Sequence, residues 1–278
     1  MDTIARMGGF MFGIYFILLA CIKPVEKQVV PVQEVIEKAN TDVPQKTQGV
    51  TSVEKLGFID LRKEFSNIEE PLFFRLRRLE IGPQGTVGFH EHKNRPGVAY
   101  ILEGAITEYR DSEQLVRKTG EYSFEYNGVQ HGWKNHTQEP VRAIVVDVWS
   151  PGEEESPEIG VLPEQKEFGE ESPKTNSGIA LAKKEMSSLD DIFEGKTLRI
   201  RVVSVESGGV VGAHKHESRP SFAYVLSGDV IEHRGDGDYP HESGSSVAER
   251  NGLMHWWKNT GEEAASIVVV DIVDVPKK

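Results

Sequence analysis

The chain has 278 residues, of which 38% are hydrophobic and 8% aromatic, and its formal net charge is −12. This length fits one to two domains, and the aromatic content is too high for a disordered chain. The negative charge, together with the lack of a lysine–arginine cluster, argues against binding to nucleic acid. The single cysteine, Cys21, excludes an intramolecular disulfide.

The first twenty residues predict a signal peptide. Residues 7–20 are apolar, a run too short to span a bilayer comfortably and typical of a signal-peptide hydrophobic region. The run ends in LLAC, with Cys21 last, which resembles a bacterial lipoprotein lipobox. The resemblance implies cleavage before Cys21, lipidation of its thiol and attachment to a membrane. An uncleaved anchor or an ordinary signal peptide is the alternative. Ile22 gives no aspartate retention signal, so we expect a periplasm-facing lipoprotein of the outer membrane.

Two segments of biased composition divide the rest of the chain. Residues 21–50 are mostly polar with three prolines, and they predict a flexible tether that reaches roughly 30 Å. Residues 151–178 are rich in glutamate, proline and glycine and predict an acidic linker. We therefore expect two domains, over residues 51–150 and 179–278.

The two predicted domains are copies of one another. Residues 73–149 align with residues 197–273 without a gap, at an offset of 124, and 27 of the 77 positions are identical. A period this long indicates tandem domains rather than a solenoid. Both copies consist of short alternating or β-branched runs closed by glycine, such as VAYILEG at 98–104 and FAYVLSG at 222–228. The predicted fold class is all-β, a sandwich or barrel.

Each copy carries two histidines one residue apart, His90 and His92 in the first and His214 and His216 in the second. Residues i and i+2 of a strand share a face, so each pair forms half of a metal site. A lone His-x-His is weak evidence, and an ordinary surface or core histidine pair is the alternative.

A second motif follows in each copy, GEYSFEYNGVQHGWKN at 120–135 and GSSVAERNGLMHWWKN at 244–259. Together the two motifs resemble those of the cupin superfamily, in which His-x-His precedes a glycine and a later Gly-x5-Pro-x-Gly-x2-His-x3-Asn supplies another histidine. The resemblance covers both copies and implies two tandem antiparallel, jelly-roll-like β-barrels. It also implies that His131 and His255 complete three-histidine metal sites.

Both copies depart from the cupin pattern at the acidic ligand. The cupin glutamate would fall at Gly97 and Ser221, neither of which can supply a carboxylate. Each predicted site therefore keeps three histidines and open positions. Glu125 and Glu249 occupy equivalent positions before the turn that leads to the third histidine. We expect them to act as a fourth ligand or general base, and a hairpin-end carboxylate paired with a lysine is the alternative.

Two further pairs are candidates for substrate binding. Arg95 and Arg219 each precede a proline, which holds their backbone extended, and could clamp a substrate carboxylate or form a rim salt bridge. Trp133 and Trp257 lie two residues after the third histidine and could wall a pocket or belong to the core. Three histidines have no counterpart in the other copy and are assigned to the surface: His136, His233 and His241.

These features predict a metal-dependent enzyme with up to one Fe²⁺, Mn²⁺, Zn²⁺ or Ni²⁺ per barrel. Its expected reaction is that of a dioxygenase, or of an isomerase or lyase, on a small polar or acidic molecule. A non-catalytic lipoprotein that binds a small ligand is the alternative, because the fold does not distinguish the two. A homodimer is compatible with the sequence.

Overall fold

Antiparallel β-strands make up nearly all of the regular structure. The computed structural model describes residues 43–110, 113–152, 156–159, 163, 179–185 and 193–275. Within these ranges one 3-10 turn, η1 (Leu61–Lys63), interrupts the strands, and no helix could cross a membrane. The predicted signal peptide, the predicted lipidation site at Cys21, most of the predicted tether and most of the predicted acidic linker lie outside the described residues.

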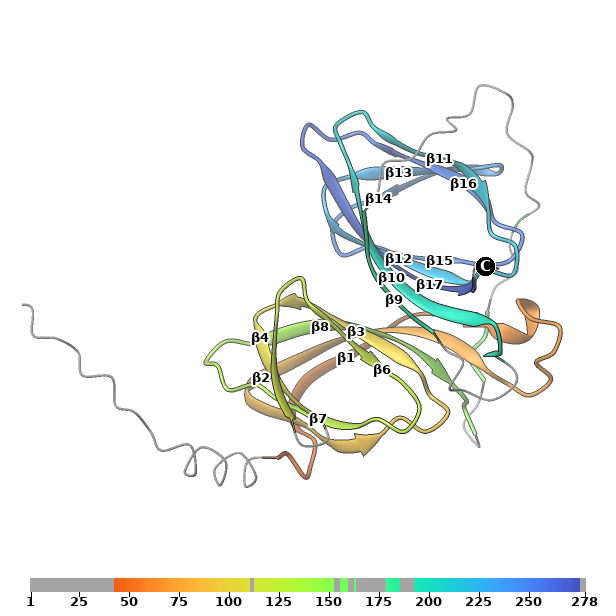
Figure 1. Ribbon diagram of the computed structural model, residues 1–278. Helices are drawn as coiled ribbons and strands as arrows, with labels where there is room; N and C mark the ends of the chain where they lie inside the picture. Colours follow the sequence, from red (N-terminus) through yellow and green to blue (C-terminus); the bar gives the residue numbers. More distant parts are fainter. Residues whose placement is uncertain are drawn as a thin grey trace, which may run out of the picture. The chain divides into compact units, whose positions relative to one another are not determined.

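The first repeat forms one antiparallel sheet in the order β5-β4-β7-β2-β8-β3-β6, with β1 paired to β2. Figure 1 shows this sheet, in orange to green, curved into a barrel. Its strands are β1 (Gln48–Asp60), β2 (Phe73–Glu91), β3 (Gly97–Glu103), β4 (Ala105–Arg110), β5 (Glu113–Lys118), β6 (Tyr122–Glu125), β7 (Gln130–Lys134) and β8 (Val141–Trp149).

The second repeat forms two antiparallel sheets, in the orders β15-β12-β17-β10-β9 and β11-β16-β13-β14. The long strand β2 of the first barrel corresponds to two strands here, β10 and β11. The strands of the second barrel are β9 (Ile179–Glu185), β10 (Lys196–Val205), β11 (Val210–Lys215), β12 (Ser221–Ser227), β13 (Val230–Arg234), β14 (Gly237–His241), β15 (Ser246–Glu249), β16 (Met254–Asn259) and β17 (Ala265–Asp274). The predicted all-β fold is confirmed.

The apolar run at 141–149 shows why the sequence folds this way. Six of its nine residues are valine, isoleucine or alanine, as expected of a strand buried on both faces, and all of β8 except Arg142 and Trp149 is buried. Ala143 and Val145 pack in a cluster with Trp133 inside the first barrel. Ile144 and Val146, which alternate with them, pack in a different cluster on the outer face. One face of β8 therefore lines the inside of the first barrel, and its other face belongs to a cluster that contains residues of both repeats.

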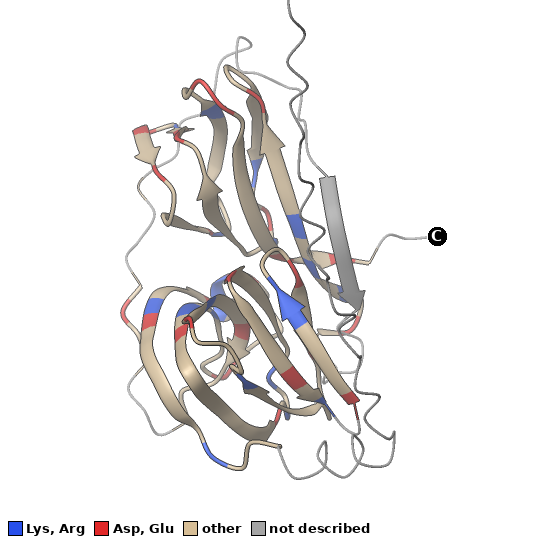
Figure 2. Cartoon of the chain, turned by 90° about the vertical axis from the view of Figure 1, so that its left-hand side faces the viewer, with Lys and Arg blue, Asp and Glu red and all other residues tan. Residues whose placement is uncertain are grey.

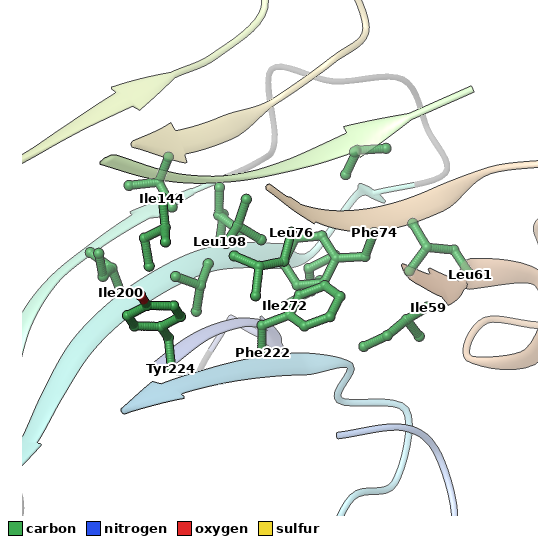
Figure 3. Packing of buried hydrophobic residues seen from close by; sticks show 14 of the residues in the cluster. Ile59, Leu61, Phe74, Leu76, Ile144, Leu198, Ile200, Phe222, Tyr224 and Ile272 are labelled. Carbon is green, nitrogen blue, oxygen red and sulfur yellow. The ribbon is translucent and has the colours of Figure 1, made fainter. Parts of the chain in front are cut away.

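The outer cluster joins the two repeats. Phe74 and Phe222 are at most 2% exposed, and their ring centroids lie 5.4 Å apart. Figure 3 shows side chains of both repeats in one packed layer, including Leu76, Ile200 and Tyr224. Residues 42–278 accordingly form one compact unit. This shared core was not predicted from the sequence, which indicated two separate tandem domains.

Charged residues of both signs are interspersed along the strands and loops of the two barrels (Figure 2). Some of them are buried as matched pairs. Arg75 lies opposite Asp147 in the β2–β8 register, and Arg199 lies opposite Asp271 in the β10–β17 register. Their shortest contacts are 2.7 Å and 2.6 Å, and both aspartates are fully buried.

Candidate metal centres

Three histidines of the first barrel converge at the end of β2. The register of β2 and β7 sets His90 opposite His131, and the amide of His92 donates to the carbonyl of Val129 at 2.9 Å. The Nε2 atom of His92 lies 3.0 Å from Nε2 of His90 and 3.0 Å from Nε2 of His131. The strand pairing therefore brings together residues that are 39 positions apart in the chain.

The second barrel repeats this arrangement. His214 on β11 lies opposite His255 on β16, and His216 follows directly after β11. The three Nε2 atoms lie 3.1 to 3.2 Å from one another. The structure thus forms both of the predicted three-histidine clusters.

The other ring nitrogen of each histidine has an oxygen partner, which defines the tautomer. In the first barrel Nδ1 of His90 lies 2.9 Å from the carbonyl oxygen of Gly88, and Nδ1 of His92 lies 2.9 Å from that of Arg95. The Nδ1 atom of His131 lies 3.1 Å from the carboxylate of Glu108. A carbonyl or carboxylate only accepts, so each Nδ1 carries the proton and each Nε2 presents a lone pair.

The second barrel has the same outer partners. Nδ1 of His214 and Nδ1 of His216 lie 2.9 and 3.0 Å from the carbonyl oxygens of Gly212 and Arg219. Nδ1 of His255 lies 2.6 Å from the carboxylate of Glu232. Such partners are typical of metal-ligating histidines, because they fix the ring orientation and the tautomer.

This donor set fits a divalent metal ion. Three lone pairs that face one another at about 3 Å with no proton between them repel, and a cation at their centre turns that repulsion into coordination. Burial lowers the pKa of His92 and of His216 to about 4, so both rings are neutral at neutral pH, as ligation requires.

The two candidate acids point toward the histidines. The carboxylate of Glu125 lies 3.5 Å from Nε2 of His92 and 3.5 Å from Nε2 of His131, and its side chain is 4% exposed. The carboxylate of Glu249 lies 3.6 Å from Nε2 of His216 and of His255. Both carboxylates are therefore within reach of a ligand or base position and do not point to solvent.

Strand register explains how these acids come to stand beside the metal centres. Glu125 on β6 lies opposite Gly97 on β3, and Glu249 on β15 lies opposite Ser221 on β12. A Cβ atom at Gly97 would stand 3.3 Å from Oε2 of Glu125. The carboxylate has thus moved one strand across the sheet relative to the cupin position, and the glycine leaves room for it.

The two acids differ in their surroundings. Burial raises the pKa of Glu125. Burial opposes ionisation of Glu249 as well, but the neighbouring histidines and the Ser221 hydroxyl, which donates to its Oε2, lower its pKa. The serine at the position of Gly97 is thus one chemical difference between the two sites.

Arg95 and Arg219 lie beside the histidine clusters, which they contact through the backbone. Their backbone carbonyls accept from His92 and His216, a role that the sequence analysis did not predict. The side chain of Arg95 is 35% exposed with Nε 3.7 Å from Asp147, whereas Nη2 of Arg219 lies 3.4 Å from Nε2 of His216. Both guanidinium groups are thus positioned for a ligand near the metal.

The first centre opens into a cavity of about 460 Å³. The three histidines, Glu125, Arg95 and Trp133 line it, and Gln45 and Thr47 from the start of the described chain form part of its wall. Trp133 is 3% exposed and also belongs to the barrel core, so both interpretations of this residue hold. Trp257 packs in the corresponding core of the second barrel.

Two buried glutamates were missed by the sequence analysis. Glu108 and Glu232 are fully buried and bind the third histidine of each site. Burial alone would raise the pKa of Glu108, but His131, Arg110 and a serine hydroxyl hold it at about 2. The signal that could have found these glutamates is their identity at the repeat offset of 124.

The assignment of His241 to the surface is wrong. Its side chain is 14% exposed, and its Nε2 lies 3.0 Å from the carboxylate of Glu232. At the corresponding position of the first barrel, Arg117 donates to Glu108 at 2.9 Å. A histidine can take this position because an imidazole, like a guanidinium, can donate to the buried carboxylate.

Two antiparallel barrels, each with three convergent imidazoles inside, define a bicupin with two candidate metal centres. The family model described as "Cupin domain" (Cupin_2) matches residues 77–147 and 201–271. The two matches together cover half of the chain, and the chain belongs to this family.

Solved structures with the same fold are distant in sequence. The Ylba protein from E. coli is 12% identical, covers 86% of this chain and 90% of its own, and superposes with a TM-score of 0.54. AerE from Microcystis aeruginosa is 13% identical, covers 80% of this chain and 98% of its own, and has a TM-score of 0.50. No curated protein matches the chain. These likenesses show the fold alone.

Proposed function

We propose that the protein is a metal-dependent enzyme that acts on a small acidic molecule, with one divalent metal per barrel. The observation that carries this proposal is the convergence of three Nε2 lone pairs beside a buried carboxylate and a cavity. A site that only stored metal would have no need of an adjoining cavity with an arginine and a carboxylate in its wall.

The histidines His90, His92 and His131 would hold the metal of the first barrel. An Fe²⁺, Mn²⁺, Zn²⁺ or Ni²⁺ ion there supplies either Lewis acidity or oxygen activation, which correspond to an isomerase or lyase and to a dioxygenase. Three protein ligands leave coordination positions open to the substrate.

The residues of the chain perform the remaining work. Glu125 can take a proton from a bound substrate, because its carboxylate is buried and lies 3.5 Å from two ligand nitrogens. Arg95 can hold an acid group through a two-pronged hydrogen bond. Trp133, Leu79 and Val145 make the inner wall apolar and limit the access of water.

The test compares Glu125→Gln with the exposed Glu113→Gln as a matched control, both in a His214→Ala background so that only the first barrel keeps its three histidines. Purified, metal-loaded protein is screened against two- to six-carbon hydroxy and oxo acids, with oxygen uptake and product formation as readouts. We expect turnover of at least one acid, a loss of roughly a hundredfold or more in Glu125→Gln, and no change in Glu113→Gln. Tight binding of an acid without any product would instead identify a ligand-binding protein.

We further propose that the mature protein is a lipoprotein that begins at Cys21 and faces the periplasm from the outer membrane. The support is the apolar run that ends in LLAC at Cys21. Cys21→Ser should release the protein from membranes or leave it unprocessed. A variant that fractionates and migrates like the wild type contradicts the lipid anchor.

A further inference from the structure

The first barrel holds more positive charge beside its metal centre than its buried acid can neutralise. Asp147 is fully buried and faces three arginines. Arg75 makes a complete two-pronged pair with it, with Nε–Oδ1 at 2.9 Å and Nη2–Oδ2 at 2.7 Å. Arg77 adds a contact of 3.0 Å to Oδ2, and Nε of Arg95 lies 3.7 Å from the same oxygen. One carboxylate thus balances one of three cations.

The two surplus arginines line the cavity. Arg77 and Arg95 are both part of its wall, together with the three histidines and Glu125. The Nε atoms of Arg77 and Arg95 are buried and have no hydrogen-bond partner among the described residues. Among the lining residues that the structure describes, Glu125 is the single carboxylate. With neutral histidines the wall therefore has an excess of one positive charge before a metal binds.

For Arg77, whose side chain is 19% exposed, such an arrangement is unfavourable unless an anion completes it. A guanidinium that is removed from water without full pairing loses more in desolvation than its partial contacts return. Burial accordingly lowers the pKa of Arg77, although Asp147 opposes this effect. Planar guanidinium groups bind carboxylates in two-pronged geometry, so an acid group is the ligand that best satisfies this pair.

We propose, on the basis of the function proposed above, that Arg77 and Arg95 form an anion subsite apart from the metal. The substrate is then a small dianion with an acid group at each end, one end at the metal and the other at the arginine pair. A cavity of about 460 Å³ has room for such a molecule. Arg77 becomes a specificity-determining residue that no sequence motif indicates.

The second barrel contains the same set of residues. Arg199 makes the two-pronged pair with Asp271 at 2.9 and 2.6 Å, and Arg201 adds a longer contact of 3.4 Å. The Nε of Arg201 is likewise buried without a partner among the described residues, and Arg219 is the equivalent of Arg95. The second barrel thus repeats the pairing of Asp271 with Arg199 and Arg201, whereas the guanidinium of Arg219 lies 3.4 Å from Nε2 of His216.

The experiment compares two acids of equal chain length that differ in one carboxylate, succinate and butyrate. Binding to full-length protein loaded with Zn²⁺ is measured by calorimetry, and the metal content of each sample is determined in parallel. The variants carry His214→Ala so that the first barrel alone holds metal. Arg77→Met and Arg95→Met are compared with Arg142→Met, which removes the same charge from an exposed surface position. Arg77→Lys keeps the charge if the methionine variant folds poorly.

We expect the parent to bind succinate at least tenfold more tightly than butyrate. Arg77→Met and Arg95→Met should abolish this preference while the metal content stays the same, Arg77→Lys should retain part of it, and Arg142→Met should retain all of it. Equal affinity for the two acids in a metal-loaded parent, or an unchanged preference in Arg77→Met, overturns the inference alone. A parent that takes up no metal overturns the proposed function together with the inference.

Discussion

Removing the charge of Glu108 should weaken the first metal centre although Glu108 is not itself a ligand. The carboxylate accepts from Nδ1 of His131 at 3.1 Å, from Arg110 at 2.6 Å and from Arg117 at 2.9 Å. In Glu108→Gln the amide oxygen can satisfy only part of this set, and the amide NH₂ group would face guanidinium donors. The tautomer of His131 then loses the partner that fixes it.

The size of the effect follows from this geometry. Loss of an outer partner of a ligating histidine typically lowers metal affinity about 10- to 100-fold. Two guanidinium groups also lose a fully buried counter-charge, and removing one partner of a buried pair costs about 3–5 kcal/mol of unfolding free energy. The Arg117 side chain is 25% exposed and can regain some contact with water, so we expect the lower part of this range.

The assay is a competition titration of Zn²⁺ against a chelator in a His214→Ala background, with urea unfolding of the same samples. Glu103→Gln is the control, because Glu103 forms a surface pair with Arg142 and is 62% exposed. Glu232→Gln in a His90→Ala background should reproduce the result in the second barrel. Metal affinity of Glu108→Gln within twofold of its parent would refute the argument that this carboxylate orients His131.

Three other predictions concern space, pH and the shared core. Gly97→Val should lower metal content in the first barrel and cost about 1–3 kcal/mol, because a Cβ there would stand 3.0 Å from Cβ of Asp147; full metal content in this variant would contradict the packing argument. Burial raises the pKa of Glu64 to about 7, so the folded protein favours the protonated side chain. The protonated Glu64 therefore contributes its full stabilisation below pH 4.5, and this stabilisation is lost as the pH rises through 7. In the wild type this loss lowers the unfolding free energy by up to about 3 kcal/mol between pH 4.5 and pH 8, and Glu64→Gln should abolish the decrease when both proteins are unfolded in urea at the two pH values. The same pH dependence in both proteins would contradict the prediction. Phe222→Ala should cost about 3–5 kcal/mol and leave a single unfolding transition for both barrels, whereas an intact wild-type protein with two separate transitions would show that the core is not shared.

The sequence was sufficient to predict the fold and the histidine clusters. Repetition at a constant offset exposed the tandem barrels, and the i, i+2 spacing of His90 and His92 placed both on one strand face. The missing acid at Gly97 was informative as well, because it directed attention to Glu125, whose carboxylate the structure places beside the histidines. These features depend on local spacing, which a single chain displays directly.

The remaining features depend on register between strands that are distant in the chain. Glu108 contacts His131 because β4 pairs with β7, with Arg110 opposite His131, and nothing within either strand indicates this pairing. Phe74 packs against Phe222 because both barrels bury an outer face, yet an outward apolar residue reads like any other strand residue. Arg77 matches no sequence motif, and its surroundings are defined by its contact with Asp147, on a strand distant in the chain, and by its place in the cavity wall.

The metal content of the native protein tests the central claim most directly. Elemental analysis of full-length protein purified without chelators should give two divalent ions per chain, because each barrel presents three convergent histidine nitrogens. His90→Ala and His214→Ala should each retain one ion, and the double variant none. A wild-type protein with no bound metal, or a double variant that binds as much metal as the wild type, would contradict the account.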